Sequence, residues 1–269
     1  MNDRIVTVPD GPTLRVRSDG AAGAPPVLLI NSLGTDLSMW DQQLPAWSAT
    51  HRIVRYDQRG HGASSVPEGP YTIEQLGADA VAVLDAFDVT RADVCGLSLG
   101  GLVALWLAAH APERVGRVVF ADTAARVGTE QGWRDRAATV REHGMDAVVD
   151  LVLERFFSPA FRATGAPAVD RVARTLRDTT PEGYAASCDA LATADLRAAA
   201  PQVTACSLVV VGTADEATPP ADARALRDLV PGAGYAELPG AGHLANLEQP
   251  ESFGRLVHDF LTDQERPHA

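Results

Sequence analysis

Short apolar runs alternate with longer amphipathic stretches along the first half of the chain. The runs are rich in apolar and β-branched residues and predict strands at 5–8, 14–18, 27–30, 53–56, 92–95 and 115–121. Between them, residues 40–47 and 73–87 place apolar side chains at the three- and four-residue spacing of a buried helix face. This alternation predicts an α/β fold, with a mostly parallel central sheet and helices on both faces.

The alternation stops after Phe120, and residues 123–200 are patterned as helices throughout. Breaks are expected at Ser158-Pro159, 165–167 and 181–183. One helix face of this segment is expected to hold residues 148, 151, 152 and 155. The segment interrupts the sheet, so we interpret it as an inserted helical cap.

Strand and helix signals return after the cap, with strands at 208–211 and 235–238 and helices at 220–229 and 250–261. The core of the fold is therefore expected to comprise residues 1–122 and 201–269. Ligands bind at the carboxyl edge of parallel strands in open α/β sheets, so the cap at 123–200 should cover that edge as a lid.

The pentapeptide Gly96-Leu97-Ser98-Leu99-Gly100 lies between a predicted strand and an apolar helical stretch at 102–109. This order is typical of a nucleophile elbow, a sharp turn that presents a serine hydroxyl above the end of a sheet. Glycine is needed on both sides because side chains there would collide within the turn. A serine that only caps the following helix is the alternative, but a cap does not require the two glycines. Ser98 is therefore the candidate nucleophile.

A serine hydroxyl needs a base to accept its proton, and in elbow hydrolases the acid and then the histidine follow the serine along the chain. Asp215 follows the strand at 208–211, and His243 lies in a glycine-rich loop after the last strand. Asp122, at the end of the strand at 115–121, reaches the same edge and is the alternative acid. Asp215 is favoured over Asp122 because of its position after the returning strand. His61 lies between two glycines and is expected to fix a turn.

Acyl transfer also needs two hydrogen-bond donors for the oxyanion of the tetrahedral intermediate. In this architecture one donor is the residue after the nucleophile, and the other lies in the loop after the third strand. These positions correspond to the backbone N–H groups of Leu99 and Leu33.

The amino-acid composition excludes several kinds of catalytic chemistry and several classes of binding partner. The formal net charge of −12 argues against nucleic acid and anionic membranes as partners. All 23 basic residues are arginine, which excludes a lysine Schiff base, a phosphate-loop lysine and a serine–lysine dyad. The three cysteines form no Cys-x-x-Cys pair, so neither a metal nor a redox centre is expected. No apolar run approaches a membrane span of about 18 residues and no signal segment is evident, so a cytoplasmic protein is expected.

Several segments resemble the 3-oxoadipate enol-lactonases, a family of the α/β-hydrolase fold superfamily. They are Asn31–Asp36, Met39-Trp40, Tyr56–Ser64, Cys95–Ser98, Gly183-Tyr184 and Gly212–Pro220. The elbow is shared across the superfamily, whereas the loop that begins at Asn31 is more specific, because many relatives begin it with His-Gly. The similarity spans nearly the whole chain and is weakest at the N-terminus and in parts of the cap.

The resemblance implies a serine hydrolase that opens a small carboxylate-bearing lactone through an acyl-serine intermediate. It implies the enol-lactone of 3-oxoadipate as substrate, in the β-ketoadipate pathway of aromatic compound catabolism, with no metal or cofactor. An acidic protein needs a local cation to bind this anion, and arginine suits a carboxylate. The candidate substrate-binding residues are Ser32, Arg126, Trp133, Arg134 and Arg136. Each arginine also fits an ordinary surface charge, and Trp133 also fits an anchor of the cap.

Other activities share the same catalytic residues. A carboxylesterase, a perhydrolase and a carbon–carbon bond hydrolase would all use this serine, acid and histidine. Dehalogenases and epoxide hydrolases are disfavoured, because their elbow carries an aspartate where this chain has Ser98. A non-catalytic binding member of the fold usually has a damaged triad, whereas all three positions are filled here.

Overall fold

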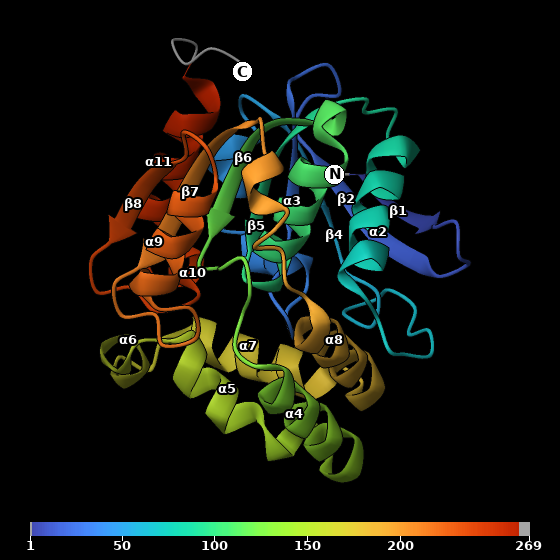
Figure 1. Cartoon of the computed structure of the whole chain (residues 1–269), viewed down its shortest axis with the longest axis vertical. Coiled ribbons are helices and arrows are strands. Elements are labelled where there is room, and N and C mark those ends of the chain that lie inside the picture. The colour runs from blue at the N-terminus through green and yellow to red at the C-terminus, as the bar shows by residue number, and fades with distance from the viewer. Residues whose placement is uncertain (1, 264–269) are drawn as a thin grey trace.

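The computed structural model describes residues 2–263, and within them one eight-stranded sheet forms the centre of the molecule (Figure 1). The strands are β1 (Asn2–Thr7), β2 (Thr13–Asp19), β3 (Pro26–Ile30), β4 (Arg52–Tyr56), β5 (Ala92–Leu97), β6 (Val115–Ala121), β7 (Cys206–Gly212) and β8 (Gly234–Leu238). Their order in the sheet is β1-β2-β4-β3-β5-β6-β7-β8. Strand β2 pairs antiparallel with both neighbours, and all other pairs are parallel. The expected α/β architecture with a mostly parallel sheet is confirmed.

Helices cover both faces of this sheet (Figure 1). In the core they are α1 (Leu44–Trp47), α2 (Ile73–Ala86), α3 (Leu99–His110), α9 (Pro220–Leu229), α10 (Ala245–Glu248) and α11 (Pro250–Thr262). Single 3₁₀ turns occur at Leu37–Trp40, Pro112–Arg114, Met145–Ala147 and Ala200–Gln202. Helix α3 packs on β3, β5 and β6 and is buried on almost every side, which explains its uniformly apolar sequence.

Strand β1 begins earlier than the apolar pattern indicates, at Asn2 rather than Ile5. It is an edge strand whose neighbour in the sheet is β2, so backbone hydrogen bonds extend it over exposed residues, and Val6 is its buried apolar residue. Ile5 accordingly stays 63% exposed. An alternation of buried and exposed side chains is therefore a poor guide to where this strand starts.

Five helices lie between β6 and β7, below the carboxyl ends of the strands in Figure 1. They are α4 (Glu130–His143), α5 (Val149–Phe156), α6 (Pro159–Ala163), α7 (Pro167–Asp178) and α8 (Pro181–Thr193). The boundaries at Pro159 and Pro167 fall within the expected breaks, and Pro181 is the first residue of α8.

The expected apolar face of α5 was wrong at one position. Leu151 is 50% exposed, and the buried face consists of Val149, Val152 and Phe156. These three residues share a face because they are spaced by three and four residues along α5, whereas Leu151 lies off that face.

Candidate active site

The turn between β5 and α3 is a strained elbow with Ser98 at its tip. Ser98 has φ +59° and ψ −117°, a conformation that costs an L-residue on the order of 1 kcal/mol. A Cβ on Gly96 would lie 2.0 Å from the Gly100 carbonyl oxygen, and a Cβ on Gly100 would lie 2.2 Å from the Ile30 carbonyl oxygen. The backbone approaches so closely that both positions require glycine.

Ser98 is held by its backbone, which leaves its hydroxyl available. Its N–H donates to the Ala121 carbonyl (3.0 Å), and the Thr123 hydroxyl donates to its carbonyl (2.8 Å). The side chain makes no capping hydrogen bond to α3, so the interpretation of Ser98 as a simple helix cap does not hold. The residue is 8% exposed, which leaves it accessible from the carboxyl edge of the sheet.

Asp215 and His243 form a buried hydrogen-bonded pair on the loops after β7 and β8. His243 Nδ1 lies 2.9 Å from Asp215 Oδ2, and the residues are 1% and 3% exposed. The carboxylate also accepts from the backbone N–H groups of Ala217 and Thr218 and from the Thr218 hydroxyl. Burial opposes ionisation of Asp215, but the charge of His243 and these hydrogen bonds outweigh it and lower its pKa. Because a carboxylate only accepts, Nδ1 carries the proton and Nε2 is the ring nitrogen able to accept one.

Asp122, the competing acid, has a different partner. Its Oδ1 accepts from the Gly212 N–H (2.8 Å), and the carboxyl also interacts with the Ala245 backbone N–H. Burial and the charge of Asp215 raise the pKa of Asp122 well above its usual range. Asp122 therefore holds its proton more tightly than Asp215 does, and the carboxylate hydrogen-bonded to His243 is Asp215.

The two expected oxyanion donors lie at a helix N-terminus and in the loop after β3. Leu99 is the first residue of α3, so its N–H has no acceptor within the helix. Leu33 lies in the loop that follows β3 and is 4% exposed. The Asn31 side chain anchors the start of this loop, because it donates to the Tyr56 carbonyl (2.7 Å) and accepts from the Trp40 indole (2.9 Å).

The three candidate arginines at the start of the helical segment have different environments. Arg126 is 3.5 Å from Asp195, and its side chain is 38% exposed. Arg134 pairs with Glu130 one turn earlier on α4, and both side chains are more than half exposed. These two arginines are neutralised by surface carboxylates, which makes them poor candidates for binding a substrate anion.

Arg136 is partly buried, and its guanidinium carbon lies 4.9 Å from the centre of the Trp133 ring. It lines a pocket of about 270 Å³ together with Val127, Gly128, Thr129, Gly132, Trp133 and Arg155. The Trp133 indole donates to the Val127 carbonyl (2.7 Å), which fixes the ring as one wall of the pocket. Trp133 therefore both anchors the helical segment and lines the pocket.

Arg155 is a second cation in this pocket and was not among the expected site residues. Burial and the neighbouring charge of Arg136 lower its pKa. Its terminal nitrogen lies 3.4 Å and 3.5 Å from the carbonyl oxygens of Glu216 and Ala217, next to Asp215. One feature of the sequence could have identified Arg155: it is the charged residue on a predicted helix face that is otherwise apolar, at 148, 151, 152 and 155.

Two buried hydroxyls near the loop after β3 have no hydrogen-bond partner among the described residues. They belong to Ser32 and Tyr184, each 0% exposed. The Tyr184 ring packs against Gly34, where a Cβ would lie 3.0 Å from its Cε2 atom. Burial raises the pKa of Tyr184, and the charge of Arg136 acts against this rise, so the phenol lies within the electrostatic reach of that arginine. Buried hydroxyls are almost always paired in proteins, so each of these two is a candidate hydrogen-bond partner for a polar ligand.

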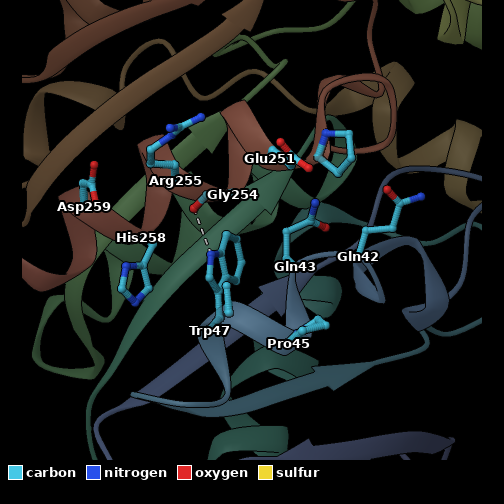
Figure 2. A pocket seen from close by; sticks show the side chains of 11 residues that line it. Gln42, Gln43, Pro45, Trp47, Glu251, Gly254, Arg255, His258 and Asp259 are labelled. Carbon is cyan, nitrogen blue, oxygen red and sulfur yellow. Dashed lines mark hydrogen bonds between the residues drawn. The ribbon is translucent and has the colours of Figure 1, made fainter.

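A separate groove of about 670 Å³ lies between α1 and α11 (Figure 2). The Trp47 indole donates to the Gly254 carbonyl at its floor (2.9 Å), and Arg255, His258 and Asp259 lie along one wall. None of the expected site residues lines this groove, and its walls carry charges of both signs. It therefore takes no part in the site at Ser98.

Residues 2–263 contain neither a metal-binding cluster of side chains nor a membrane-spanning helix. No cluster of three or more His, Cys, Asp or Glu side chains there has the geometry of a metal site. No helix in the same range is long and apolar enough to cross a membrane.

The elbow, the sheet order and the positions of Asp215 and His243 define the class of protein. The chain belongs to the alpha/beta hydrolase fold family, whose model matches residues 25–250. Within that family it is similar to 3-oxoadipate enol-lactonase 2 of Acinetobacter baylyi, with 41% identity over 90% of each chain. It is 37% identical to 3-oxoadipate enol-lactonase 1 of the same organism, over 96% of each chain.

A solved structure gives the same relationship. The enol-lactonase from Burkholderia xenovorans LB400 superposes with a TM-score of 0.94 and 42% identity, over 97% of this chain and all of that one. The resemblance to the 3-oxoadipate enol-lactonases is thus confirmed. The protein is an enzyme, a carboxylic-ester hydrolase similar to these lactonases.

Proposed function

We propose that this enzyme hydrolyses the enol-lactone of 3-oxoadipate to 3-oxoadipate, as a cytoplasmic step in the catabolism of aromatic compounds. The observation that carries the substrate class is the pair Arg136 and Arg155 in one pocket, next to the loop of Asp215. Two partly buried cations without a carboxylate among the lining residues suit a small anion. The similarity to enol-lactonases narrows that anion to a lactone with a carboxylate.

Ser98 is the nucleophile in this proposal. Its Oγ attacks the lactone carbonyl carbon while His243 Nε2 accepts the hydroxyl proton. The hydrogen bond from Nδ1 to Asp215 supports this role, because the carboxylate orients the ring and stabilises the imidazolium that forms. The backbone N–H groups of Leu99 and Leu33 donate to the oxyanion of the tetrahedral intermediate.

Collapse of the intermediate breaks the ring C–O bond and leaves an acyl group on Ser98. The leaving oxygen departs as a resonance-stabilised enolate, and this enolate takes up the proton that His243 had accepted from Ser98. Protonation on carbon gives the ketone, and His243 returns to its neutral form. His243 then removes a proton from water, which attacks the acyl carbonyl and regenerates the serine. The hydrolysis consumes one water molecule in total.

The carboxylate of the substrate binds between Arg136 and Arg155 in this proposal. Arginine donates two parallel hydrogen bonds to a carboxylate, and the Tyr184 hydroxyl supplies a further donor close to Arg136. Residues 123–200 act as a cap that excludes bulk water from this contact and so strengthens it. The centres of the Phe156 and His243 rings are 5.4 Å apart, which supports a direct contact between the cap and the catalytic histidine.

Replacing Ser98 by alanine tests the mechanism. We expect kcat for the enol-lactone to fall by at least about 10⁴, with the unfolding temperature unchanged. Ser187→Ala is the matched control, because the hydroxyl of this buried serine on α8 donates to the Gly183 carbonyl in the same helix. A Ser98→Ala enzyme that keeps near-wild-type turnover would refute the proposal.

The substrate is tested by comparing kcat/KM for the enol-lactone with that for short p-nitrophenyl esters. We expect a clear preference for the lactone, with 3-oxoadipate identified as the product by NMR. A preference for the neutral esters would instead identify a carboxylesterase that uses the same residues.

A further inference from the structure

Three side chains of the loop at 57–61 hold the backbone of the loop after β3. The contacts are Asp57 Oδ1 with the Leu37 N–H (2.8 Å), Gln58 Nε2 with the Asn31 carbonyl (2.8 Å) and His61 Nε2 with the Gly34 N–H (2.9 Å). This second loop follows β4, the neighbour of β3 in the sheet. His61 therefore does more than stabilise its own turn, because its side chain is hydrogen-bonded to the loop that contains Leu33.

The hydrogen bonds of His61 define its tautomer. A backbone N–H only donates, so His61 Nε2 must carry a lone pair to accept from Gly34. The proton of a neutral ring is then on Nδ1, which lies 3.2 Å from the Arg59 carbonyl and donates to it. Both ring nitrogens are satisfied only by the neutral Nδ1–H imidazole.

The surroundings keep the ring in that form. His61 is 2% exposed, and burial lowers its pKa to about 4. A protonated ring would present an N–H to the Gly34 N–H and break the contact. The acceptor is thus retained throughout the neutral pH range.

The Gly34 N–H belongs to the peptide unit that follows Leu33, so its hydrogen bond limits rotation about the Leu33 backbone. Gly34 itself has φ +71°, and a Cβ there would lie 2.5 Å from Leu176 Cδ2. Held between His61 and the helical segment, this part of the loop has little freedom to turn. The direction of the Leu33 N–H is set by the same contacts.

We propose that His61 is a positioning residue that holds the loop after β3 so that the Leu33 N–H points at the oxyanion. This inference rests on the proposed function, because Leu33 acts as a donor only if the reaction passes through a tetrahedral intermediate. Removal of one oxyanion donor typically costs on the order of 10² to 10³ in rate, which sets the effect to be expected.

Two substitutions separate the two hydrogen bonds of the ring. In His61→Gln the side-chain oxygen reaches as far as Nε2 and can accept from Gly34. In His61→Asn the shorter side chain reaches only as far as Nδ1, so the contact with Gly34 is lost. We expect kcat to fall about 100-fold in His61→Asn and less than tenfold in His61→Gln, with KM changed by less than threefold in both.

Affinity for a boronic acid that mimics the tetrahedral intermediate supplies the second readout. Its Ki should rise in parallel with the loss of kcat/KM, because both depend on the oxyanion donors. His51→Gln is the control, since His51 is also buried, and its Nδ1 contacts the Thr50 hydroxyl instead of this loop. Circular dichroism melting shows that each variant is folded at the assay temperature.

The proposal is overturned if His61→Asn keeps the wild-type kcat and boronate Ki, or if its kcat falls while the boronate Ki stays unchanged. All rates are measured on both the enol-lactone and p-nitrophenyl acetate. If the lactone is not a substrate, the ester still reports on the oxyanion site through Ser98, so failure of the proposed substrate is distinguishable from failure of the His61 proposal.

Discussion

Replacing Arg136 by alanine removes one of two cations from the pocket next to the Asp215 loop. A hydrogen bond to a charged group contributes about 1.5–3 kcal/mol when it is shielded from water. Arg136 is partly buried, between the Trp133 ring and Tyr184, so a value near 2 kcal/mol is appropriate. At 1.36 kcal/mol per factor of ten, this corresponds to a loss of about 30-fold in kcat/KM for an anionic lactone.

The loss should appear mainly in KM, because the substrate carboxylate is bound equally in the ground state and the transition state. Steady-state kinetics on the enol-lactone and on a neutral p-nitrophenyl ester of similar size measure it. For the neutral ester we expect a change of less than threefold, since it has no carboxylate to bind. Raising the salt concentration should weaken lactone binding in the wild type more than in Arg136→Ala.

Arg134→Ala is the matched control, two residues away on the same helix. Its exposed pair with Glu130 contributes at most about 0.5 kcal/mol, so activity should stay within about twofold of wild type. Equal losses on the lactone and the neutral ester would refute carboxylate recognition by Arg136. So would an Arg134→Ala enzyme as impaired as Arg136→Ala.

Three further substitutions test other parts of the molecule. Burial lowers the pKa of His61 to about 4 from about 6.5 in the unfolded chain, so the stabilisation it provides is complete above about pH 6.5 and is lost as the pH falls towards 4. In urea unfolding, the free energy of unfolding of the wild type should fall by about 3 kcal/mol more than that of His61→Gln between pH 6.5 and pH 4. Curves of unfolding free energy against pH that run parallel for variant and wild type would contradict this. Tyr184→Phe should lower kcat/KM for the lactone with little loss of unfolding free energy, because within residues 2–263 the hydroxyl makes no hydrogen bond of ordinary geometry and interacts with Arg136; a clear destabilisation would show that this hydroxyl stabilises the fold. Gly183→Ala should cost about 1–3 kcal/mol in thermal unfolding, because its Cβ would lie 2.2 Å from the Gly60 carbonyl oxygen; an unchanged melting temperature would mean that α8 and the Gly60 loop separate freely.

The parts of the site that are encoded locally could be predicted from the sequence. The elbow at Ser98 needs glycines at fixed spacing, and the strand before it and the helix after it are readable from their apolar residues. The order of Asp215 and His243 along the chain follows from the returning strands. The sequence favoured Asp215 over Asp122, and the structure adds the hydrogen bond between Asp215 and His243, which no local pattern encodes.

The substrate pocket depends on how the helices between β6 and β7 pack, which local patterns do not encode. Arg134 and Arg136 are two residues apart and so point to different sides of α4, but the sequence does not say which side faces the pocket. Arg155 comes from a different helix and meets Arg136 only after folding. The role of His61 was hidden for the same reason, because its partner Gly34 lies 27 residues away in the sequence.

The raised pKa of Asp122 affects how any substitution of Asp215 must be interpreted. Part of the rise in the pKa of Asp122 comes from the negative charge of Asp215, so replacing Asp215 by asparagine removes that repulsion. Asp122 then ionises more readily and returns some negative charge to the end of the neighbouring strand β6. A single Asp215→Asn variant therefore underestimates what a negative charge contributes at this edge of the sheet, and only the double variant with Asp122→Asn removes both carboxyl groups.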